Sequence, residues 1–328
     1  MSWTILHKNG LQLPQIGWWL DPSRPVDKAI VSHAHFDHLA ASREVVCTPA
    51  TARFMRHRLP RKRVEHRLPF GQTEPLTPDC SVTLLPAGHI LGSALILLNH
   101  RELGSLLYTG DFKLRQGLVA ETCATPRADT LVMETTFGRS HYCMPPSDQV
   151  RGQLQDFCRQ TLAAGDTPVL MAYSLGKAQE VLASLAGLEA PIMVHPQIAE
   201  MNHLHEDLGV TLPPHRLFDD RELAGHVVLC APAPKNSAFL KRIPRPRTAF
   251  VSGWALDRST VFRQRCDAAF PLSDHADYPD LLCFVDLVKP KRVLTLHGFA
   301  ADFARTLRER GYDALALSEP NQLDLGLQ

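Results

Sequence analysis

Residues 33–38 read His-Ala-His-Phe-Asp-His, so three imidazoles and one carboxylate stand within six positions. The short apolar run before them predicts a strand that ends at the first histidine. Residues two apart in an extended segment project to the same side, so His33 and His35 can bind one ion together. Asp37 and His38 follow where the chain turns, and they face a second ion. Imidazole nitrogen and carboxylate oxygen suit zinc or manganese. A polar loop with chance histidines is the alternative, and the density of ligands at one strand end favours the metal site.

Three later segments repeat the order of an apolar strand, a ligand side chain and then a glycine or turn. The ligands and the strands that they follow are His89 after 81–87, Asp111 after 105–109, and His297 after 292–296. Each alone has a structural alternative, because a strand-end aspartate is commonly a turn former and a single histidine is commonly a hydrogen-bonded structural residue. Together they predict that several strand ends converge on one metal centre.

The predicted elements that position these ligands change in type along the chain, from strands to alternating helices and strands. The first third alternates short apolar runs with turns and predicts strands. Helical periodicity covers 147–163 and 176–187, and the apolar runs 168–172 and 226–230 read as buried parallel strands. The basic, proline-rich segment 232–247 reads as a surface loop. The tail predicts a helix over 277–288, a strand over 292–296, a helix over 299–310 and a strand over 314–317. This order predicts an α/β chain in which one domain is inserted within another.

Composition narrows the class of protein. The chain has 328 residues, of which 45% are hydrophobic, and it carries no repeat, which excludes collagen-like and disordered chains. Eight scattered cysteines without a C-x-x-C pair indicate free, mostly buried thiols in a reducing compartment. The first residues do not read as a signal peptide, and no apolar stretch is long enough to span a bilayer. We therefore expect a cytoplasmic protein that does not contact membranes.

The net charge of +1 conceals two basic runs. Residues 53–67 contain seven Lys or Arg and one Glu, and residues 235–247 contain five and no acid. Such runs are usually solvated faces. Beside a site that cleaves phosphodiesters, they also fit as tracks for a nucleic-acid backbone.

Two sets of motifs resemble known families. The H-x-H-x-D-H run and the segments 86–93 (PAGHILGS) and 109–112 (TGDF) resemble the metallo-β-lactamase superfamily. The segments ETTFG at 134–138, SDHAD at 273–277 and HG at 297–298 resemble its β-CASP branch of nucleases. The resemblance runs from Trp19 to Gly298, and the compact length is similar to that of bacterial DNA-ligase-associated exonucleases, which are relatives of the Artemis and DNA crosslink-repair nucleases.

This resemblance implies an αββα metallo-β-lactamase sandwich with an inserted small α/β β-CASP cap domain. The implied boundaries are 1–138 for the first part of the core, 139–267 for the cap, and 268–328 for the return segment of the core.

The resemblance also implies roles for single residues. His33, His35 and His89 would hold the first of two divalent ions, zinc or manganese; Asp37, His38 and His297 would hold the second; and Asp111 would bridge both. Asp21 matches a carboxylate that orients the histidine loop. His275 matches a histidine that contacts the scissile phosphate and protonates the leaving oxygen, and Glu134 would orient it. We expect Asp37, His275 and Glu134 to be essential for turnover.

The chemistry of phosphodiester hydrolysis requires such groups. Two ions about 3.5–4 Å apart supply a bridging hydroxide and clamp the phosphate oxygens. The 3′-oxygen of a nucleotide is a poor leaving group, so a general acid is worth roughly 10²–10⁴-fold. Hydrolysis of a small amide would not need His275 or Glu134, and this favours a phosphodiesterase over a small-molecule hydrolase.

Segments of the expected cap carry substrate signals. The turn Tyr173-Ser174-Leu-Gly176-Lys177 reads as a helix start, where free N–H groups favour an anion, and it resembles the 5′-phosphate pocket of DNA crosslink-repair nucleases. The structural alternative makes Ser174 an N-cap and Gly176 a packing residue. Trp254 could stack on a base, although a buried tryptophan is the commoner outcome.

The resemblance predicts a 5′ exonuclease that acts on single-stranded or frayed DNA with 5′-phosphorylated ends, in DNA repair. His297 and the SDHAD segment read more like RNA-type members, so a β-CASP ribonuclease or RNA 3′-end processing factor is the alternative. A nucleic-acid-binding scaffold with a degenerate site is a third possibility, which the intact ligand set disfavours. An ATP-dependent DNA ligase and a helicase are the partners that the family implies.

Overall fold

The computed structural model describes residues 2–257 and 259–317, and the chain divides into two compact units. The first unit comprises Met1–Gln116, Ala120–Cys143 and His275–Gln328, and the second comprises Gly117–Val119 and Met144–Asp274. The α/β class with an inserted unit is thereby confirmed. The domain boundaries implied by the resemblance, 138/139 and 267/268, stay a prediction, and the end of the expected return segment lies outside the described residues.

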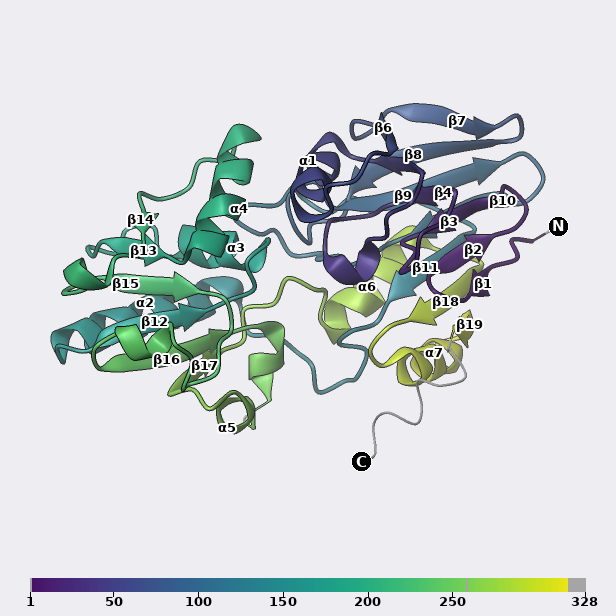
Figure 1. The fold of residues 1–328 in the computed structure, drawn as a ribbon. Helices are drawn as coiled ribbons and strands as arrows, with labels where there is room; N and C mark the ends of the chain where they lie inside the picture. Colours follow the sequence, from purple (N-terminus) through teal and green to yellow (C-terminus); the bar gives the residue numbers. More distant parts are fainter. Residues whose placement is uncertain (1, 258, 318–328) are drawn as a thin grey trace. The chain divides into compact units, whose positions relative to one another are not determined.

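Two sheets form the first unit (Figure 1). One sheet has the order β1 (Leu6–His7), β2 (Leu11–Leu13), β3 (Trp18–Leu20), β4 (Lys28–Ile30), β5 (Glu44–Cys47) and β6 (Val64–Arg67). The other has the order β19 (Asp313–Ala316), β18 (Arg292–Leu296), β11 (Thr130–Glu134), β10 (Gly104–Tyr108), β9 (Ala94–His100), β8 (Cys80–Pro86) and β7 (Thr73–Thr77). Both sheets mix parallel and antiparallel pairs.

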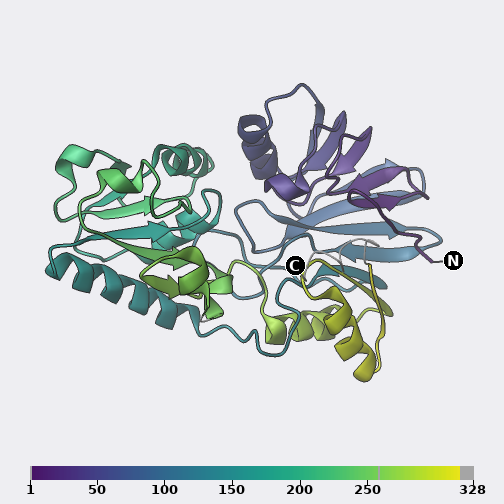
Figure 2. The same ribbon diagram turned by 60° about the horizontal axis from the view of Figure 1, so that its bottom comes forward.

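Apolar side chains fill the space between the two sheets. Leu13, Leu20 and Ile30 of the first sheet share a buried cluster with Leu84 and Leu106 of the second. Alternate residues of the second sheet face outward against α6 (Tyr278–Val288) and α7 (Ala300–Glu309). Figure 2 shows these two helices below the second sheet and α1 (Pro49–Arg58) beside the first, which gives the four layers of an αββα sandwich.

The second unit is built on one parallel sheet. Its order is β14 (Arg216–Leu217), β13 (Ile192–Val194), β15 (Val227–Cys230), β12 (Thr167–Met171), β16 (Pro246–Val251) and β17 (Ala268–Phe270). One face packs against α2 (Ser147–Ala163), α3 (Lys177–Ser184) and α4 (Pro196–Asp207). The opposite face is covered by connecting segments such as η3 (Leu240–Arg242), and α5 (Thr260–Gln264) lies between β16 and β17 in sequence.

The strand directions bring the predicted ligands to one edge of the sandwich. Strands β10, β11 and β18 are parallel neighbours, and β8 runs in the same direction because it is antiparallel to β9. Carboxyl ends of such strands meet at a single sheet edge. His89 follows β8, Asp111 follows β10, Glu134 ends β11 and His297 follows β18. In the facing sheet, Asp21 follows β3 and the histidine run follows β4.

Several predicted elements are confirmed and others differ. The helix predicted over 147–163 is α2 with those limits, and the tail elements fall within one or two residues of their predicted bounds. The segment 232–247 is not loop throughout, since β16 begins at Pro246. The elements that were not predicted include α1, α4 and β13. No helix in the described ranges is long and apolar enough to cross a membrane. All eight cysteines are free, and five of them are buried.

Candidate metal centre

Four ligand atoms of the first predicted group lie together. His33 Nε2 is 3.1 Å from His35 Nδ1, which is itself 3.1 Å from His89 Nε2. The Oδ2 atom of Asp111 lies 3.5 Å from the His33 nitrogen and 3.8 Å from the His89 nitrogen. The four ligand atoms all lie within 4.8 Å of one another.

This spacing fits a bound cation. Donors that share one tetrahedral zinc ion at about 2.0–2.1 Å stand about 3.3 Å from one another. The observed separations of 3.1–3.8 Å scatter around that value. Neutral imidazole nitrogens and a carboxylate are also the chemical donors that zinc and manganese take. The donor set and its spacing therefore fit a divalent ion.

The second predicted group is more open. His38 Nε2 lies 3.4 Å from the same Asp111 Oδ2 atom and 3.7 Å from Asp37 Oδ2. The Asp37 side chain is 79% exposed, and the His297 ring lies 5.8 Å from the His38 ring between centroids. One carboxylate oxygen of Asp111 thus lies between the two groups, where a bridging ligand would lie.

Asp21 accepts several hydrogen bonds that fix the orientation of the histidine loop. Its Oδ1 atom accepts the backbone N–H of Ser32 at 2.7 Å. Its Oδ2 atom accepts hydrogen bonds from His38 Nδ1 at 2.9 Å, Tyr108 Oη at 2.9 Å and the Ser32 hydroxyl at 2.5 Å. The bond to Nδ1 leaves the Nε2 atom of His38 to face Asp111. Ser32 and Tyr108 were not predicted; Ser32 directly precedes the motif, whereas Tyr108 gives no local signal.

Burial and charge separate the protonation states of the ligands. Burial lowers the pKa of His33 well below its ordinary value, and the nearby His38 lowers it further. Burial acts in the same direction on His38, but the carboxylates of Asp111 and Asp21 outweigh it and raise the pKa of His38 well above its ordinary value. The pKa of Asp111 is held low by His38 and His275 against the effect of burial. Burial, together with His38, also lowers the pKa of His297. The centre therefore places the anionic Asp111 beside the neutral imidazole of His33 and the protonated imidazole of His38, whose proton a bound cation would displace.

Glu134 and His275 form a hydrogen-bonded pair next to this cluster. His275 Nδ1 lies 2.8 Å from Glu134 Oε1, which also accepts the Phe112 N–H at 3.1 Å. The other carboxylate oxygen accepts the N–H of Thr136 at 3.1 Å. The ring of His275 lies 4.7 Å from that of His89 between centroids. Glu134 is fully buried, so its orientation and that of the imidazole are fixed.

Two glycines next to ligands allow close packing. A Cβ atom on Gly110, before Asp111, would lie 2.4 Å from the Ser32 hydroxyl oxygen, and one on Gly298 would lie 2.5 Å from the Thr136 backbone. Both have positive φ, and His297 itself adopts φ +59°. The Thr135 hydroxyl donates to the His297 carbonyl at 2.8 Å and supports this strained backbone.

The predicted substrate residues all lie in the second unit. The Lys177 side chain is 1% exposed, and its Nζ donates to the Leu272 carbonyl at 2.7 Å and pairs with Asp274 at 2.9 Å. Gly176, with φ +83°, donates its N–H to Gln179 at 2.7 Å. Tyr173 is 54% exposed and Ser174 is half-buried. Trp254 is 38% exposed, so it is neither buried nor fully open. Their substrate role stays a prediction, and the ion pair gives Lys177 a structural role.

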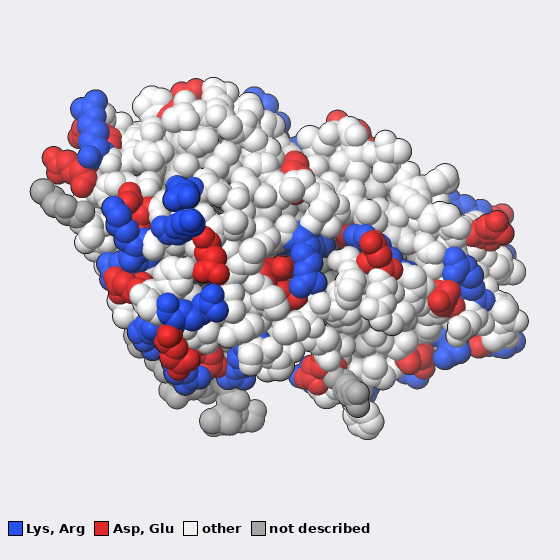
Figure 3. Space-filling model, turned by 180° about the vertical axis from the view of Figure 1, so that it is seen from behind, with Lys and Arg blue, Asp and Glu red and all other residues white. Residues whose placement is uncertain are grey.

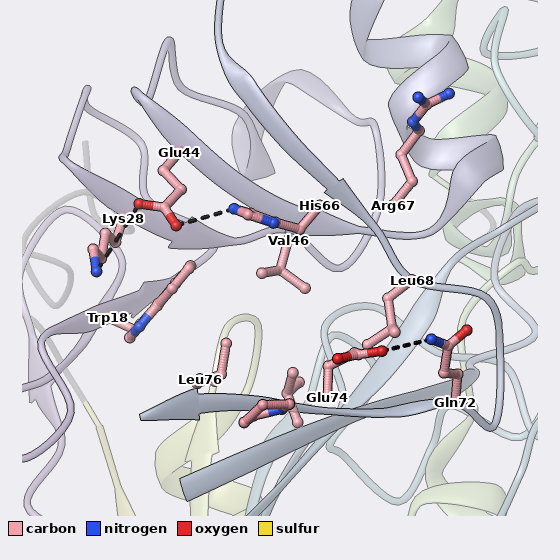
Figure 4. Close-up of a pocket in the computed structure, with 12 residues that line it drawn as sticks. Trp18, Lys28, Glu44, Val46, His66, Arg67, Leu68, Gln72, Glu74 and Leu76 are labelled. Atoms are coloured by element: carbon pink, nitrogen blue, oxygen red, sulfur yellow. Dashed lines mark hydrogen bonds and ion pairs between the residues drawn. The ribbon is translucent and has the colours of Figure 1, made fainter. Parts of the chain in front are cut away.

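A cavity of about 320 Å³ lies between the two sheets of the first unit (Figure 4). Its lining comes from strands β3–β8 and includes Trp18, Lys28, Glu44, His66 and Glu74 but none of the predicted ligands. Glu44 pairs with His66 at 3.0 Å and with Lys28 at 4.0 Å.

The chain is similar to known proteins along its whole length. Residues 266–317 match the family "Zn-dependent metallo-hydrolase RNA specificity domain". A protein named "Probable DNA ligase" from Opitutus terrae is 57% identical over 328 residues, which are 100% of this chain and 32% of that protein. The "5' exonuclease Apollo" of Gallus gallus is 30% identical over 81% of this chain and 57% of its own length.

More distant relatives show the same relation. The "Transcription termination factor FttA" of Thermococcus kodakarensis is 28% identical over 78% of this chain and 50% of its own length. A crystal structure of a protein of unknown function from Enterococcus faecalis V583 superposes with a TM-score of 0.59 at 13% identity, over 89% of this chain and 79% of that one, and it shows the fold alone. The chain spans between about a third and a little over half of the length of these three curated relatives.

The fold and the comparisons point to the same family. The fold is an αββα sandwich with an inserted α/β unit and a His and Asp cluster at one sheet edge. The family matched by residues 266–317 is a metallo-hydrolase by its description, and the chicken relative is an exonuclease by its name. These findings support the assignment of the chain to the β-CASP nuclease branch of the metallo-β-lactamase superfamily.

Proposed function

We propose that the chain is a metal-dependent 5′ exonuclease that hydrolyses phosphodiester bonds in single-stranded or frayed DNA. The observation that carries the proposal is the pair of His275 and Glu134, held at 2.8 Å beside the ligand cluster. A buried carboxylate that orients a partly exposed imidazole is typical of a general acid. A nucleotide leaving group requires such an acid.

The ligand cluster defines where metal ions would be held. His33, His35 and His89 would bind one divalent ion. Asp37, His38 and His297 would bind a second, and Asp111 would contact both ions. Zinc or manganese ions supply, when bound, positive charge for phosphate oxygens and a lowered pKa for water. Asp21 fixes the ring of His38 through Nδ1, so that its Nε2 atom is directed at the centre.

The role of His275 follows from which nitrogen is already used. Glu134 accepts a hydrogen bond from the Nδ1–H group, so a proton on Nε2 is the one available for transfer to the leaving oxygen. Side-chain exposure of 20% leaves the imidazole accessible, whereas that of Glu134 is only 1% exposed. The glutamate acts through the histidine and is a positioning residue.

The DNA substrate is supported by two relatives. The Opitutus terrae protein, named a probable DNA ligase, aligns with every residue of this chain. The chicken relative is named a 5′ exonuclease. Because the first relative is about three times as long as this chain and bears the ligase name, we also propose a DNA ligase as a functional partner.

An RNA substrate is the second candidate. The family matched by residues 266–317 is described as an RNA specificity domain, and His297 lies within that range. Relatives named transcription termination factors match this chain from several archaea. A β-CASP ribonuclease or RNA 3′-end processing factor would explain these similarities.

One digestion separates the two candidates. Single-stranded DNA and RNA of the same sequence, with 5′-phosphate ends and a 3′ fluorophore, are incubated with purified protein and Mn²⁺ or Zn²⁺. Progressive shortening of the DNA from its 5′ end, with release of nucleotides, is expected. Degradation of the RNA with intact DNA would support the RNA candidate and overturn the DNA proposal.

A matched pair of variants ties the activity to the site. His275→Gln should abolish the shortening, while His203→Gln, which changes an exposed histidine of α4, should leave it unchanged. Equal loss in both variants, or none in His275→Gln, would show that the observed digestion does not come from this centre.

A further inference from the structure

Phe36 is an exposed aromatic residue in the middle of the metal-binding motif. Its side chain is 62% exposed, whereas His33 and His38 on either side of it are buried. It begins the short helical turn η1 (Phe36–His38), which also carries Asp37. The exposed phenyl ring therefore offers an apolar face to another molecule beside the ligands.

Arg58 stacks on this ring from a different element. The guanidinium carbon lies 3.9 Å from the centroid of Phe36, close enough for a strong cation–π contact. Arg58 is the last residue of α1, where a positive charge is favoured by the helix dipole. Its Nε atom is buried and has no hydrogen-bond partner among the described residues. The stack therefore holds the guanidinium in place without a carboxylate that would neutralise it at hydrogen-bond distance.

Helix α1 is fixed to both ligand loops. Its N-cap Thr48 and the first-turn Thr51 both donate their hydroxyl groups to the Gly92 carbonyl, at 2.7 and 3.1 Å, in the loop that follows His89. Its other end reaches the histidine run through Arg58. The position of the Phe36–Arg58 stack is therefore determined by the same loops that hold the ligands.

Positive charge continues from this stack along the chain. Arg61 and Lys62 follow α1, are exposed, and form no ion pair within the described ranges. Arg56, by contrast, is neutralised by Glu65. On the face of the molecule that Figure 3 shows, Lys and Arg lie mixed with Asp and Glu, so no comparable run of one sign gathers there.

We propose that Phe36 and Arg58 form a binding platform for one nucleotide of a single-stranded nucleic acid at the rim of the metal centre, with the base stacked on the open face of the phenyl ring and a phosphate bound by the guanidinium. This inference rests on the proposed nuclease function and specifies its substrate. Bases inside a duplex keep both faces covered by neighbouring bases, whereas an unpaired base offers a free face to Phe36. The platform therefore favours single strands and frayed ends over the interior of a duplex.

Binding without turnover tests the platform separately from the catalytic proposal. Fluorescent single-stranded DNA and an abasic strand of the same length are titrated with the His275→Gln protein. Loss of one base–aromatic stack corresponds to about 1–3 kcal/mol, or roughly 5- to 150-fold in Kd. We expect Phe36→Ala to weaken binding of the normal strand by such a factor, to leave abasic binding unchanged, and Phe36→Trp to restore it.

Arg58→Gln should weaken both strands alike and reduce the slope of log Kd against log salt by about one contact. Phe262→Ala, which removes a phenyl ring that is 89% exposed elsewhere, is the matched control and should change nothing. Unchanged binding in Phe36→Ala, or an equal loss for normal and abasic strands, would overturn the platform. If Phe36→Ala behaves as expected but wild-type protein cleaves no DNA, the platform stands and the exonuclease proposal fails.

Discussion

The Nδ1 atom of His275 lies 2.8 Å from the Oε1 atom of Glu134, although 141 residues separate the two in sequence. The glutamate ends β11 in the centre of a sheet, and the histidine begins the return segment of the first unit. A fully buried carboxylate on a rigid strand therefore fixes an imidazole that follows a long insertion. This relationship is the reason to expect proton transfer at the centre.

Glu134→Gln should lower kcat on single-stranded DNA by about 10²-fold or more, because the amide carries no charge to stabilise a protonated imidazole. It also has one acceptor oxygen in place of two, so its NH2 group must face one of the donors that now bond the carboxylate. The amide keeps the size of the side chain, so the thermal unfolding midpoint and the metal content should stay close to those of the wild type. Steady-state rates, differential scanning calorimetry and elemental analysis measure the three quantities.

The leaving group provides the control for this prediction. Bis(p-nitrophenyl) phosphate releases p-nitrophenolate, which departs without a proton, so the loss in Glu134→Gln should be much smaller on this ester than on DNA. An equal loss on both substrates would place the defect in the ligand cluster and not in proton transfer.

Metal binding should follow the difference between the two ligand groups. In the first group, the Nδ1 atom of His35 lies 3.1 Å from the Nε2 atoms of both His33 and His89. The second group includes Asp37, whose side chain is largely exposed. We expect the wild type to bind about two divalent ions per chain, and Asp37→Asn to lose one of them while it keeps the ion of the first group. His35→Ala should lose the ion of the first group. Elemental analysis after dialysis against a weak chelator measures these contents.

An apo protein with no affinity for Zn²⁺ or Mn²⁺ by calorimetry would contradict the assignment of this cluster. Retention of both ions in Asp37→Asn would instead exclude Asp37 as a ligand. Thermal stability adds a readout that does not depend on activity, because an ion that binds only the folded chain raises the unfolding midpoint.

The ligand run could be read from the sequence because its spacing matches local geometry. His33 and His35 are two apart at a strand end, and their nitrogens do face one cluster. Helix α1 could not be read, because three of its ten residues are arginines and only three of its buried residues, Ala52, Phe54 and Met55, are apolar. Its basic side chains dominated the pattern, and the packing that makes it a helix is tertiary.

Hydrogen bonds between residues that are distant in sequence could not be predicted either. Nothing in the sequence around Tyr108 indicates that its hydroxyl bonds Asp21, 87 residues away. The run His203-Leu-His205 reads as surface, and this prediction was wrong for His205, which α4 buries completely. Helical spacing places the two histidines on different faces, so only one of them is exposed.

Lys177 separates a structural role from a substrate role. Its buried ammonium holds Leu272 and Asp274, the residues just before His275. Lys177→Met should lower the free energy of unfolding by on the order of 3 kcal/mol, because it breaks a buried ion pair. It should also reduce turnover equally on 5′-phosphate and 5′-hydroxyl DNA ends, since the displaced segment positions His275 for both.

The ratio of kcat/KM for the two end groups decides between the roles. A selective loss on 5′-phosphate ends would support the phosphate pocket implied by the family resemblance. Arg159→Met, which removes an exposed ion pair on α2, is the control and should change neither stability nor the ratio.

His205 should make the second unit sensitive to acid. Burial lowers the pKa of this histidine to about 4, although its Nδ1 atom bonds the Met201 carbonyl at 2.7 Å. In the unfolded chain its pKa is about 6.5, so the unfolded state binds the proton first as the pH falls. The stabilising contribution is therefore complete above pH 6.5 and is lost between about pH 6.5 and 4. The difference in pKa corresponds to about 3 kcal/mol over that window.

His205→Phe should flatten the dependence of the unfolding free energy on pH by that amount. Urea titration at pH 7.5 and 4.5 measures this free energy. The control His203→Phe, on the exposed face of α4, should not change the dependence. Parallel pH profiles for wild type and His205→Phe would show that protonation of His205 is not what destabilises the chain in acid.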